Sequence, residues 1–186
     1  RNMSILQCCN YISEIKKIPN LINDTLHLRS KIQSLAGLFY QFDSIDFLGR
    51  QYMYPLAMES ALKLKELTYI NSHAYAAGEL KHGPLATVYE GKPFFFLAPQ
   101  ESLREKNISN MKEIKARGGT IILLKQKNQQ FPKDCFDFSI EIPKAPSYIL
   151  PIISAIPLQM FAMYMAQKKG LNVDKPRNLA KSVTVE

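Results

Sequence analysis

Residues that bind metals or form disulfides are scarce in this 186-residue sequence. Its three cysteines are Cys8, Cys9 and Cys135, it has three histidines, and it contains no tryptophan. The cysteines form no CxxC pair and no zinc spacing, and an odd number does not suit a disulfide framework. No two histidines have metal-ligand spacing, so we expect no metal site. The thiols favour a reducing, cytoplasmic compartment, with Cys8 and Cys9 buried as small apolar groups.

The common nucleotide-binding and nucleophile motifs are also absent. The chain has no GxGxxG, no P-loop and no GxSxG, which removes support for dinucleotide-dependent, kinase or hydrolase functions. No signal peptide opens the chain, which begins at Arg1 inside a predicted helix. We therefore expect a truncated chain whose earlier domains are missing.

Charge of one sign is not concentrated in any block. The chain has 24 Lys and Arg against 16 Asp and Glu, a formal net charge of +8. Such a surface can attract nucleic acid, anionic lipid or phosphorylated small molecules. Because the lysines are scattered, a solvated lysine-rich surface explains the charge equally well. We expect no nucleic-acid partner.

Charge is missing altogether from Tyr148 to Gln167, close to the roughly 20 residues needed to cross a bilayer. Pro151, Pro157 and Gln159 interrupt this stretch. A helix buried by its own domain or by a partner subunit has the same composition. We favour burial and expect no membrane association.

The composition that remains is that of one globular domain, with 46% hydrophobic and 22% charged residues. Apolar runs that predict strands alternate with amphipathic stretches that predict helices. This order favours a doubly wound α/β sheet. A capping box, Ser102 with Glu105, is expected to open the helix that stops at Gly118. The predicted helices cover residues 2–17, 20–42, 55–69, 78–88 and the stretch up to Gly170, and the strands cover 44–49, 93–98, 120–124 and 136–142.

The predicted helix 55–69 carries Glu59, Lys63 and Glu66 at spacings of four and three, which place them along one face. A glutamate beside a lysine in a half-buried setting can act as a tuned acid–base pair. The simpler alternative is an exposed Glu59–Lys63 ion pair worth about 0.3–0.5 kcal/mol. Spacing alone favours that alternative.

Two further candidates lie in less regular segments. His82 is flanked by Gly83 and Pro84, at a turn or helix end where a histidine can transfer protons near neutral pH. A surface or capping histidine is the more common interpretation of such a context. Lys181 lies in the tail 174–186, and it would have to lose its proton before acting as an amine nucleophile. A chain end is usually frayed, and chain order does not show whether this one docks.

Several strings resemble the second sugar isomerase (SIS) domain of the glucosamine-6-phosphate synthase family. The match runs in order from about residue 20 to the end, and its closing string belongs to the synthase branch. Gln51 and Ser60 stand where the family often has glycine, which affects local backbone geometry rather than proton-transfer groups. The matching strings are Leu48–Arg50, Tyr54–Glu59, Ala61–Glu66, Ala74–Pro84, Ser109–Asn110, Ala116–Gly119, Ile156–Gln159 and Asp174–Glu186.

This resemblance implies a fold and a division of the chain. The fold is a mainly parallel five-stranded sheet flanked by helices, a flavodoxin-like three-layer sandwich. Residues 1–19 would be a linker helix from a missing domain, 20–170 the second SIS domain, and 171–186 a catalytic tail. The family's glutaminase and first SIS domain, which supplies most of the phosphate cradle, would be missing partners. The fragment alone is therefore expected to be inactive.

The resemblance also implies a reaction, in which fructose 6-phosphate and glutamine-derived ammonia give glucosamine 6-phosphate. Lys181 would form a Schiff base with the open-chain ketose, with Ala180, Lys181 and Glu66 contacting the substrate. Glu66 would move a proton between C1 and C2, and Lys63 would assist proton shuttling near the sugar oxygens. His82 would help to open the sugar ring in a neighbouring subunit, which implies a homodimer. No cofactor is expected.

Two other functions stay open at this point. A SIS module that only binds a phosphosugar, as a sensor does, needs neither an acid–base glutamate nor a terminal lysine. A related SIS enzyme could instead deaminate or deglycate amino-sugar phosphates, and it would not depend on glutamine.

Overall fold

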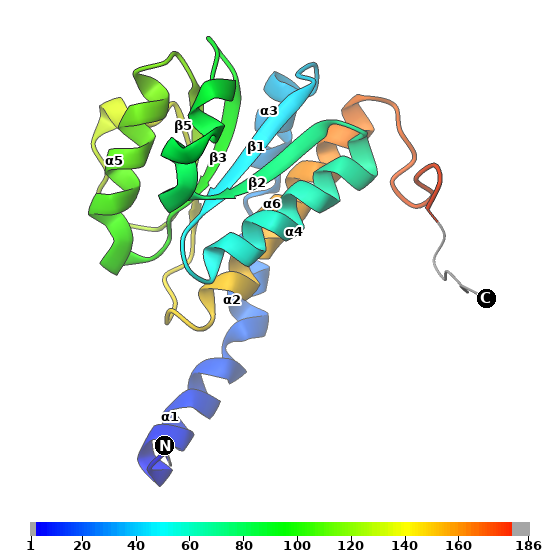
Figure 1. Cartoon of the computed structure of the whole chain (residues 1–186). Helices are drawn as coiled ribbons and strands as arrows, with labels where there is room; N and C mark the ends of the chain where they lie inside the picture. The colour runs from blue at the N-terminus through cyan, green and yellow to red at the C-terminus, as the bar shows by residue number, and fades with distance from the viewer. Residues whose placement is uncertain (1–2, 180–186) are drawn as a thin grey trace, which may run out of the picture.

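The structure, a computed structural model, describes residues 3–179 and is built on one parallel sheet of five strands (Figure 1). The strand order is β2-β1-β3-β4-β5, and every neighbouring pair is parallel. This order confirms the predicted α/β class and the five-stranded sheet. The strands are β1 (Ser44–Gly49), β2 (Asn71–Ala76), β3 (Pro93–Leu97), β4 (Thr120–Gln126) and β5 (Phe138–Ile142).

Strand β3, at the centre of the sheet, is apolar along its whole length because both faces of the sheet are covered. In β3, Phe95 faces one layer, where it stacks on Phe47 of β1 with ring centroids 5.0 Å apart. Phe94 and Phe96 face the opposite layer. Alternation along each strand therefore divides the core into two halves, one on each side of the sheet.

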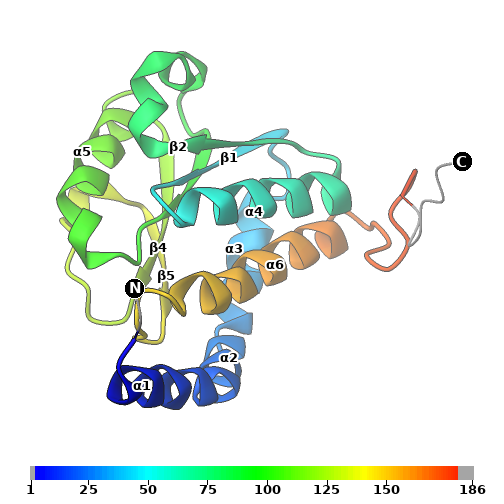
Figure 2. The ribbon, with the colours of Figure 1, turned by 60° about the horizontal axis from the view of Figure 1, so that its bottom comes forward.

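Helices form the outer layers (Figure 2). On one face, α3 (Arg29–Phe39), α4 (Met53–Thr68) and α6 (Leu150–Lys168) pack together and against the sheet. On the other face lie α5 (Arg104–Lys115) and the short 3-10 helix η1 (Ala77–His82). Each crossover helix runs antiparallel to the strands, so α4 begins at the carboxyl edge of the sheet and ends at its amino edge.

Helix α6 is long and apolar enough to cross a membrane by length and composition alone. Most of it is nevertheless buried inside the domain, where Phe161 meets Phe95 edge to face at 4.7 Å. The predicted burial of this charge-free stretch is therefore confirmed. Gly170, with φ of +69°, ends the helix and lets the amide of Leu171 donate to the carbonyl of Ala166.

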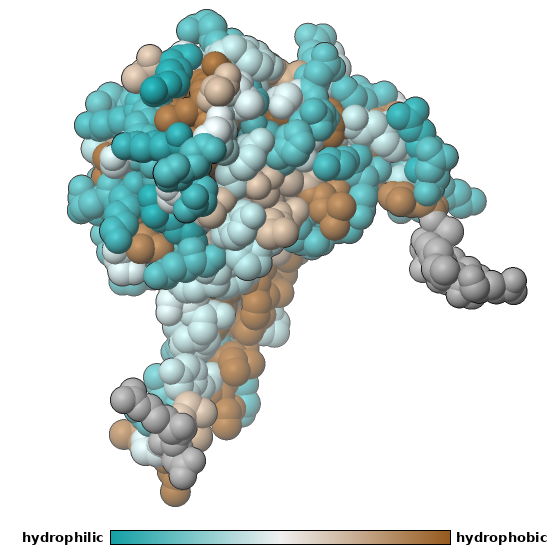
Figure 3. Space-filling view, in the orientation of Figure 1, coloured by the Kyte–Doolittle hydropathy of each residue, from teal (hydrophilic) through white to brown (hydrophobic). Residues whose placement is uncertain are grey.

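The N-terminal helix α1 (Ile5–Lys16) extends away from the sheet and buries none of its own residues. Its apolar side chains form a stripe along this extension in Figure 3, and Ile5 and Leu6 are among the most exposed of them. Cys9 is exposed and Cys8 is only half-buried, so the expectation that both thiols are buried is wrong. The reason is that α1 has few contacts within residues 3–179, chiefly with α2 and through the ring of Tyr11, whose centroid lies 4.8 Å from that of Tyr148.

Four details of the predicted elements are wrong. The helix expected over 78–88 is two 3-10 helices, η1 and η2 (Pro84–Thr87), which are separated at Gly83. The helix expected over 20–42 is two helices, α2 (Ile18–Leu26) and α3, separated at His27 and Leu28. Strand β2 was not predicted because it is an edge strand whose outward positions are polar. Ser102 does not cap α5, because it lies inside the 3-10 turn η3 (Glu101–Leu103) and Leu103 takes the N-cap position.

Candidate functional site

The predicted face of α4 exists and carries a close ion pair. Ala57, Ala61 and Leu64 turn the apolar side of the helix into the core. The opposite side leaves Lys63 and Glu66 partly exposed, and Lys63 Nζ donates a hydrogen bond to Glu66 Oε2 at 2.5 Å. Because one helical turn separates positions i and i+3, the two charged groups meet without bending the helix.

Lys63 pairs with Glu66 rather than chiefly with Glu59. The Lys63 Nζ to Glu59 Oε1 distance is 3.8 Å, against 2.5 Å to Glu66. Glu59 is also the more exposed carboxylate, at 48% against 27% for Glu66. The simple Glu59–Lys63 pair suggested by spacing is therefore the weaker of the two contacts.

The pair further favours the ammonium form of Lys63, which an ordinary lysine already adopts at neutral pH. The hydrogen bond to Glu66 is the largest influence and raises the pKa of Lys63, burial partly opposes it, and the nearby negative charges of Glu66 and Glu59 add to the rise. Lys63 is consequently an ammonium group at neutral pH. It can donate hydrogen bonds to oxygen atoms and stabilise negative charge, but it cannot serve as a base.

The tail that follows α6 returns to the end of α4. The backbone amide of Arg177 donates to the hydroxyl of Tyr69 at 2.8 Å, and the Arg177 guanidinium lies 4.1 Å from the centre of the Tyr69 ring. A partly exposed cation–π contact is worth about 0.5–1 kcal/mol and a hydrogen bond about 0.5–1.5 kcal/mol. Together these contacts hold the tail weakly beside the last turn of α4. Ala180 and Lys181 lie outside the described residues.

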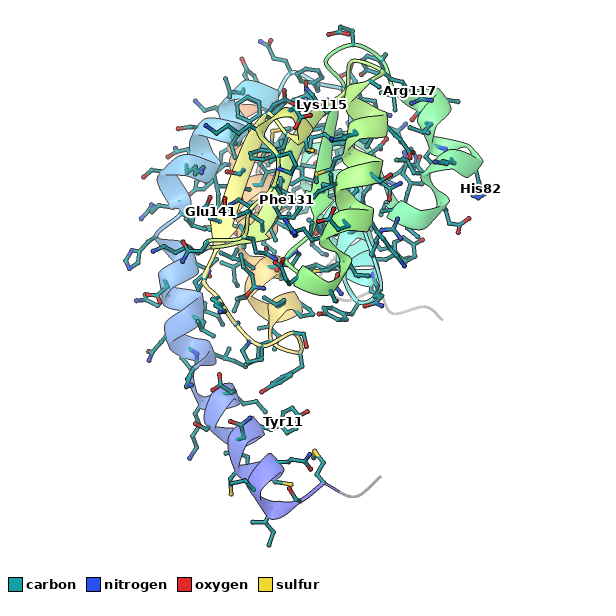
Figure 4. The ribbon with its side chains drawn as sticks, turned by 90° about the vertical axis from the view of Figure 1, so that its left-hand side faces the viewer. Tyr11, His82, Lys115, Arg117, Phe131 and Glu141 are labelled. Atoms are coloured by element: carbon teal, nitrogen blue, oxygen red, sulfur yellow. The ribbon has the colours of Figure 1, made fainter. Side chains whose placement is uncertain are left out.

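The structure does not bring His82 to this pair. Glu66 lies in the last turn of α4, at the amino edge of the sheet, whereas His82 ends η1, which follows β2 at the carboxyl edge. The length of α4 separates the two edges by about 20 Å, at 1.5 Å per residue. The His82 side chain is exposed and projects from the surface (Figure 4). One chain therefore cannot place His82 and Glu66 on the same small substrate.

Two features of the structure were missed in the sequence. No sequence pattern indicates a role for Tyr69, because its partner Arg177 is 108 positions away along the chain. Asp46 lies in the middle of β1 and is fully buried, with its Oδ2 atom 2.7 Å from the buried ammonium of Lys92. The signal for this second feature was a lone charged residue inside an otherwise apolar strand.

The cavity that Lys63 itself lines is too small for a sugar, whereas a groove of about 580 Å³ lies along the next face of α4, where Glu59 and Lys65 line it. The space beside Lys63, between α4 and α6, holds about 10 Å³, which is room for about one water molecule. A groove of about 240 Å³ lies instead at the carboxyl edge of the sheet, where Arg50, Gln51 and Lys106 line it. Within residues 3–179, no three His, Cys, Asp or Glu side chains gather as a metal site would require.

Comparisons with known proteins show the family to which the chain is related and agree with the observed fold. The SIS domain family matches residues 38–168 of the chain. The chain is 48% identical over 185 residues to the glutamine–fructose-6-phosphate aminotransferase (isomerizing) of Caldanaerobacter subterraneus subsp. tengcongensis, covering 99% of this chain and 30% of that protein. It is 43% identical to the protein of the same name from Aquifex aeolicus, covering 95% of this chain and 30% of the relative.

Solved structures give the same result. The C-terminal domain of glucosamine-fructose-6-phosphate aminotransferase from Francisella tularensis superposes with a TM-score of 0.87 and 36% identity, covering 93% of this chain and 49% of that one. A glucosamine-6-phosphate deaminase from Thermotoga maritima superposes with a TM-score of 0.67 at 24% identity, which shows a shared fold only. The chain spans about 30% of the length of the curated relatives it matches.

Proposed function

The chain belongs to the SIS domain family, and from this premise we propose that it is the sugar-isomerising part of a glutamine-dependent enzyme that makes glucosamine 6-phosphate. The similarity to aminotransferases of that activity, at 43–48% identity along nearly the whole chain, supports the proposal. The observation that carries it is the Lys63–Glu66 pair on α4, beside which the C-terminal tail docks.

The proposed division of labour follows from the chemistry of these groups. The neutral amine of Lys181 attacks the C2 ketone of open-chain fructose 6-phosphate and releases water, which leaves an imine. Ammonia from glutamine displaces the lysine, and Glu66 takes a proton from C1 and returns it to C2, which gives the amino aldose. Lys63, held as an ammonium by Glu66, donates to the sugar oxygens. Ala180 would contact the substrate beside Lys181.

The proposal requires partners that this chain lacks. Residues 1–19 would be a linker helix, residues 20–170 the second SIS domain and residues 171–186 the catalytic tail. The space beside Lys63 is too small for a hexose, so another wall must close the site, and a preceding SIS domain would supply it together with the phosphate cradle. A glutaminase domain would supply ammonia. The edge-to-edge separation of Glu66 and His82 supports a homodimer in which His82 serves the neighbouring site. The reaction would take place in the cytoplasm.

The test is glucosamine 6-phosphate synthesis by the intact protein, with Lys181→Ala as the variant and Lys175→Ala as a control in the same tail. We expect synthesis to require glutamine and to disappear in Lys181→Ala, whereas Lys175→Ala retains it. Near-normal turnover by Lys181→Ala would rule out the Schiff-base role. Turnover without any need for glutamine would favour an amino-sugar-phosphate deaminase or deglycase instead.

One observation favours a second candidate, a module that binds a phosphosugar without acting on it. The groove at the carboxyl edge, lined by Arg50 and Lys106, lies where open α/β sheets commonly bind ligands. Calorimetry with the 186-residue chain separates the two functions. We expect no fructose 6-phosphate binding at micromolar concentrations, whereas micromolar affinity that is lost in Arg50→Ala would favour the binding module.

A further inference from the structure

Tyr69 adopts a backbone conformation that a tyrosine rarely takes. It follows the last residue of α4 with φ of 61° and ψ of 14°, the left-handed position that commonly ends a helix. Glycine or asparagine suits this position, and a bulky side chain is strained there. Ending α4 therefore gives no reason for a tyrosine, and the side chain must be judged by what it touches.

Within residues 3–179 the partner of Tyr69 is the tail. The Tyr69 hydroxyl accepts a hydrogen bond from the backbone amide of Arg177, and the ring faces the Arg177 guanidinium. The chain turns directly after α6, before it reaches Tyr69. The side-chain oxygen of Asn172 stabilises this turn by accepting hydrogen bonds from the backbone amides of Asp174 and Lys175. A strained residue and a turned segment thus meet at one point.

The contact between Tyr69 and Arg177 is close along the chain to Glu66 on one side and to Lys181 on the other. Lys181 follows Arg177 by four residues, so covalent geometry limits the separation of their Cα atoms to about 14 Å. Glu66 precedes Tyr69 by one turn of α4, a rise of about 4.5 Å. Fixing Arg177 on Tyr69 therefore keeps the following chain, with Lys181, within about 14 Å of the end of α4 that carries Glu66, and tethering of this kind raises the effective concentration of a nucleophile.

We propose that Tyr69 is a positioning residue, which anchors the C-terminal tail through Arg177 so that Lys181 meets the substrate beside Glu66. The proposal rests on the proposed function for its catalytic part, but the anchoring itself does not. Tyr69 touches neither substrate nor a reacting atom in this role. It acts through the tail, and its effect is on the fraction of molecules in which the nucleophile is in place.

Three variants separate anchoring from folding. Tyr69→Phe keeps the ring and removes the acceptor hydroxyl. Tyr69→Gly removes both the hydroxyl and the ring but relieves the left-handed strain, so the stability of α4 should not fall. Tyr52→Phe is the matched control, since Tyr52 is an exposed tyrosine at the opposite end of the same helix.

The first measurement is hydrogen exchange at the Arg177 amide in the 186-residue chain, together with urea unfolding. We expect exchange to quicken by about fivefold in Tyr69→Phe, which removes only the hydrogen bond, and by about tenfold or more in Tyr69→Gly, which also removes the cation–π interaction. Tyr52→Phe should exchange as the wild type does. Unchanged exchange at Arg177 in Tyr69→Gly would overturn the anchoring, whatever the enzyme does.

The second measurement is steady-state kinetics of the intact protein. We expect kcat to fall by about tenfold in Tyr69→Gly, with the KM for fructose 6-phosphate changed less than about twofold, because the substitution misplaces the nucleophile and leaves sugar binding intact. A wild-type kcat in Tyr69→Gly would overturn the catalytic part. If the wild-type protein itself makes no glucosamine 6-phosphate, the proposed function fails with the catalytic part, and the exchange data still decide the anchoring.

Discussion

Glu66 and His82 lie at opposite edges of the same parallel sheet, although they are close in sequence. Helix α4 brings Glu66 to the amino edge, and the chain then crosses the sheet again along β2 before it reaches His82. If both residues serve one reaction, each site must combine them from two copies of the chain. The separation of Glu66 and His82 within one chain therefore predicts that two subunits contribute to each site.

Complementation between inactive variants tests this relationship. We expect Glu66→Gln and His82→Ala homodimers each to be impaired, and their mixture after subunit exchange to recover about one quarter of wild-type activity. Half of the dimers would then be mixed, and one of their two sites would be intact. If both residues came from the same subunit, every site in a mixed dimer would carry one substitution and no activity would return.

The two glutamates on α4 provide a matched pair for the acid–base role. Glu66→Gln keeps the size of the side chain but removes the proton acceptor, so we expect turnover in the intact protein to fall by about 10²–10⁴. Glu59→Gln alters a more exposed carboxylate that lies farther from Lys63, and turnover should change by less than about twofold. Equal losses of turnover in Glu66→Gln and Glu59→Gln would show that the glutamates of α4 act only through their negative charge, and not through one specific proton acceptor.

The Lys63–Glu66 pair should also appear in the pH dependence of stability. The pKa of Lys63 is raised above its ordinary value of 10.5, so its stabilising contribution is fully present below that pH and is lost as pH rises through the higher folded-state value. Both side chains are partly in water, so the contribution is under about 1 kcal/mol.

Urea unfolding of the wild type and Lys63→Met measures this contribution. We expect their stability difference to be constant from about pH 7 to 9 and to shrink only above the ordinary lysine pKa. A difference that already vanishes between about pH 7 and 9 would contradict the raised pKa.

The buried ion pair between Asp46 and Lys92 predicts a larger effect on folding. Lys92→Met removes the ammonium partner of the buried Asp46 side chain, and breaking a buried ion pair in this way should cost about 3–5 kcal/mol in urea unfolding. The double variant Asp46→Leu/Lys92→Met removes both charges, and we expect it to recover most of that loss. If the stability loss in the double variant equals the sum of the losses in Asp46→Leu and Lys92→Met, the two side chains do not interact.

Much of the fold could be predicted from sequence because it depends on local periodicity. The apolar runs at Phe94–Leu97 and Ile121–Leu124 predict strands covered on both faces, and the structure confirms them. Strand β2 escaped prediction because an edge strand buries only part of its length and lacks such a run. The supposed capping box at Ser102 failed because the same residues also suit a 3-10 turn, and the choice between the two depends on the path of the chain after β3.

The candidate site, like the fold, could be predicted only in part. The spacing of Glu59, Lys63 and Glu66 places them on one face of a helix, since three or four residues make one turn. Whether Lys63 pairs more closely with Glu59 or with Glu66 depends on side-chain geometry and exposure, which the spacing of the residues in the sequence does not predict.

By itself, the sequence determined the alternation of helices and strands, the charged face of α4 and the apolar character of α6, because each depends on residues within a few turns of one another. Only the tertiary structure decided that Arg177 meets Tyr69, that Asp46 meets Lys92, and that Glu66 and His82 lie at opposite edges of the sheet. These relationships join segments that are brought together, or kept apart, by the order of strands in the sheet. Strand order depends on burying both faces of the sheet at once, a condition on the whole chain that no local pattern expresses.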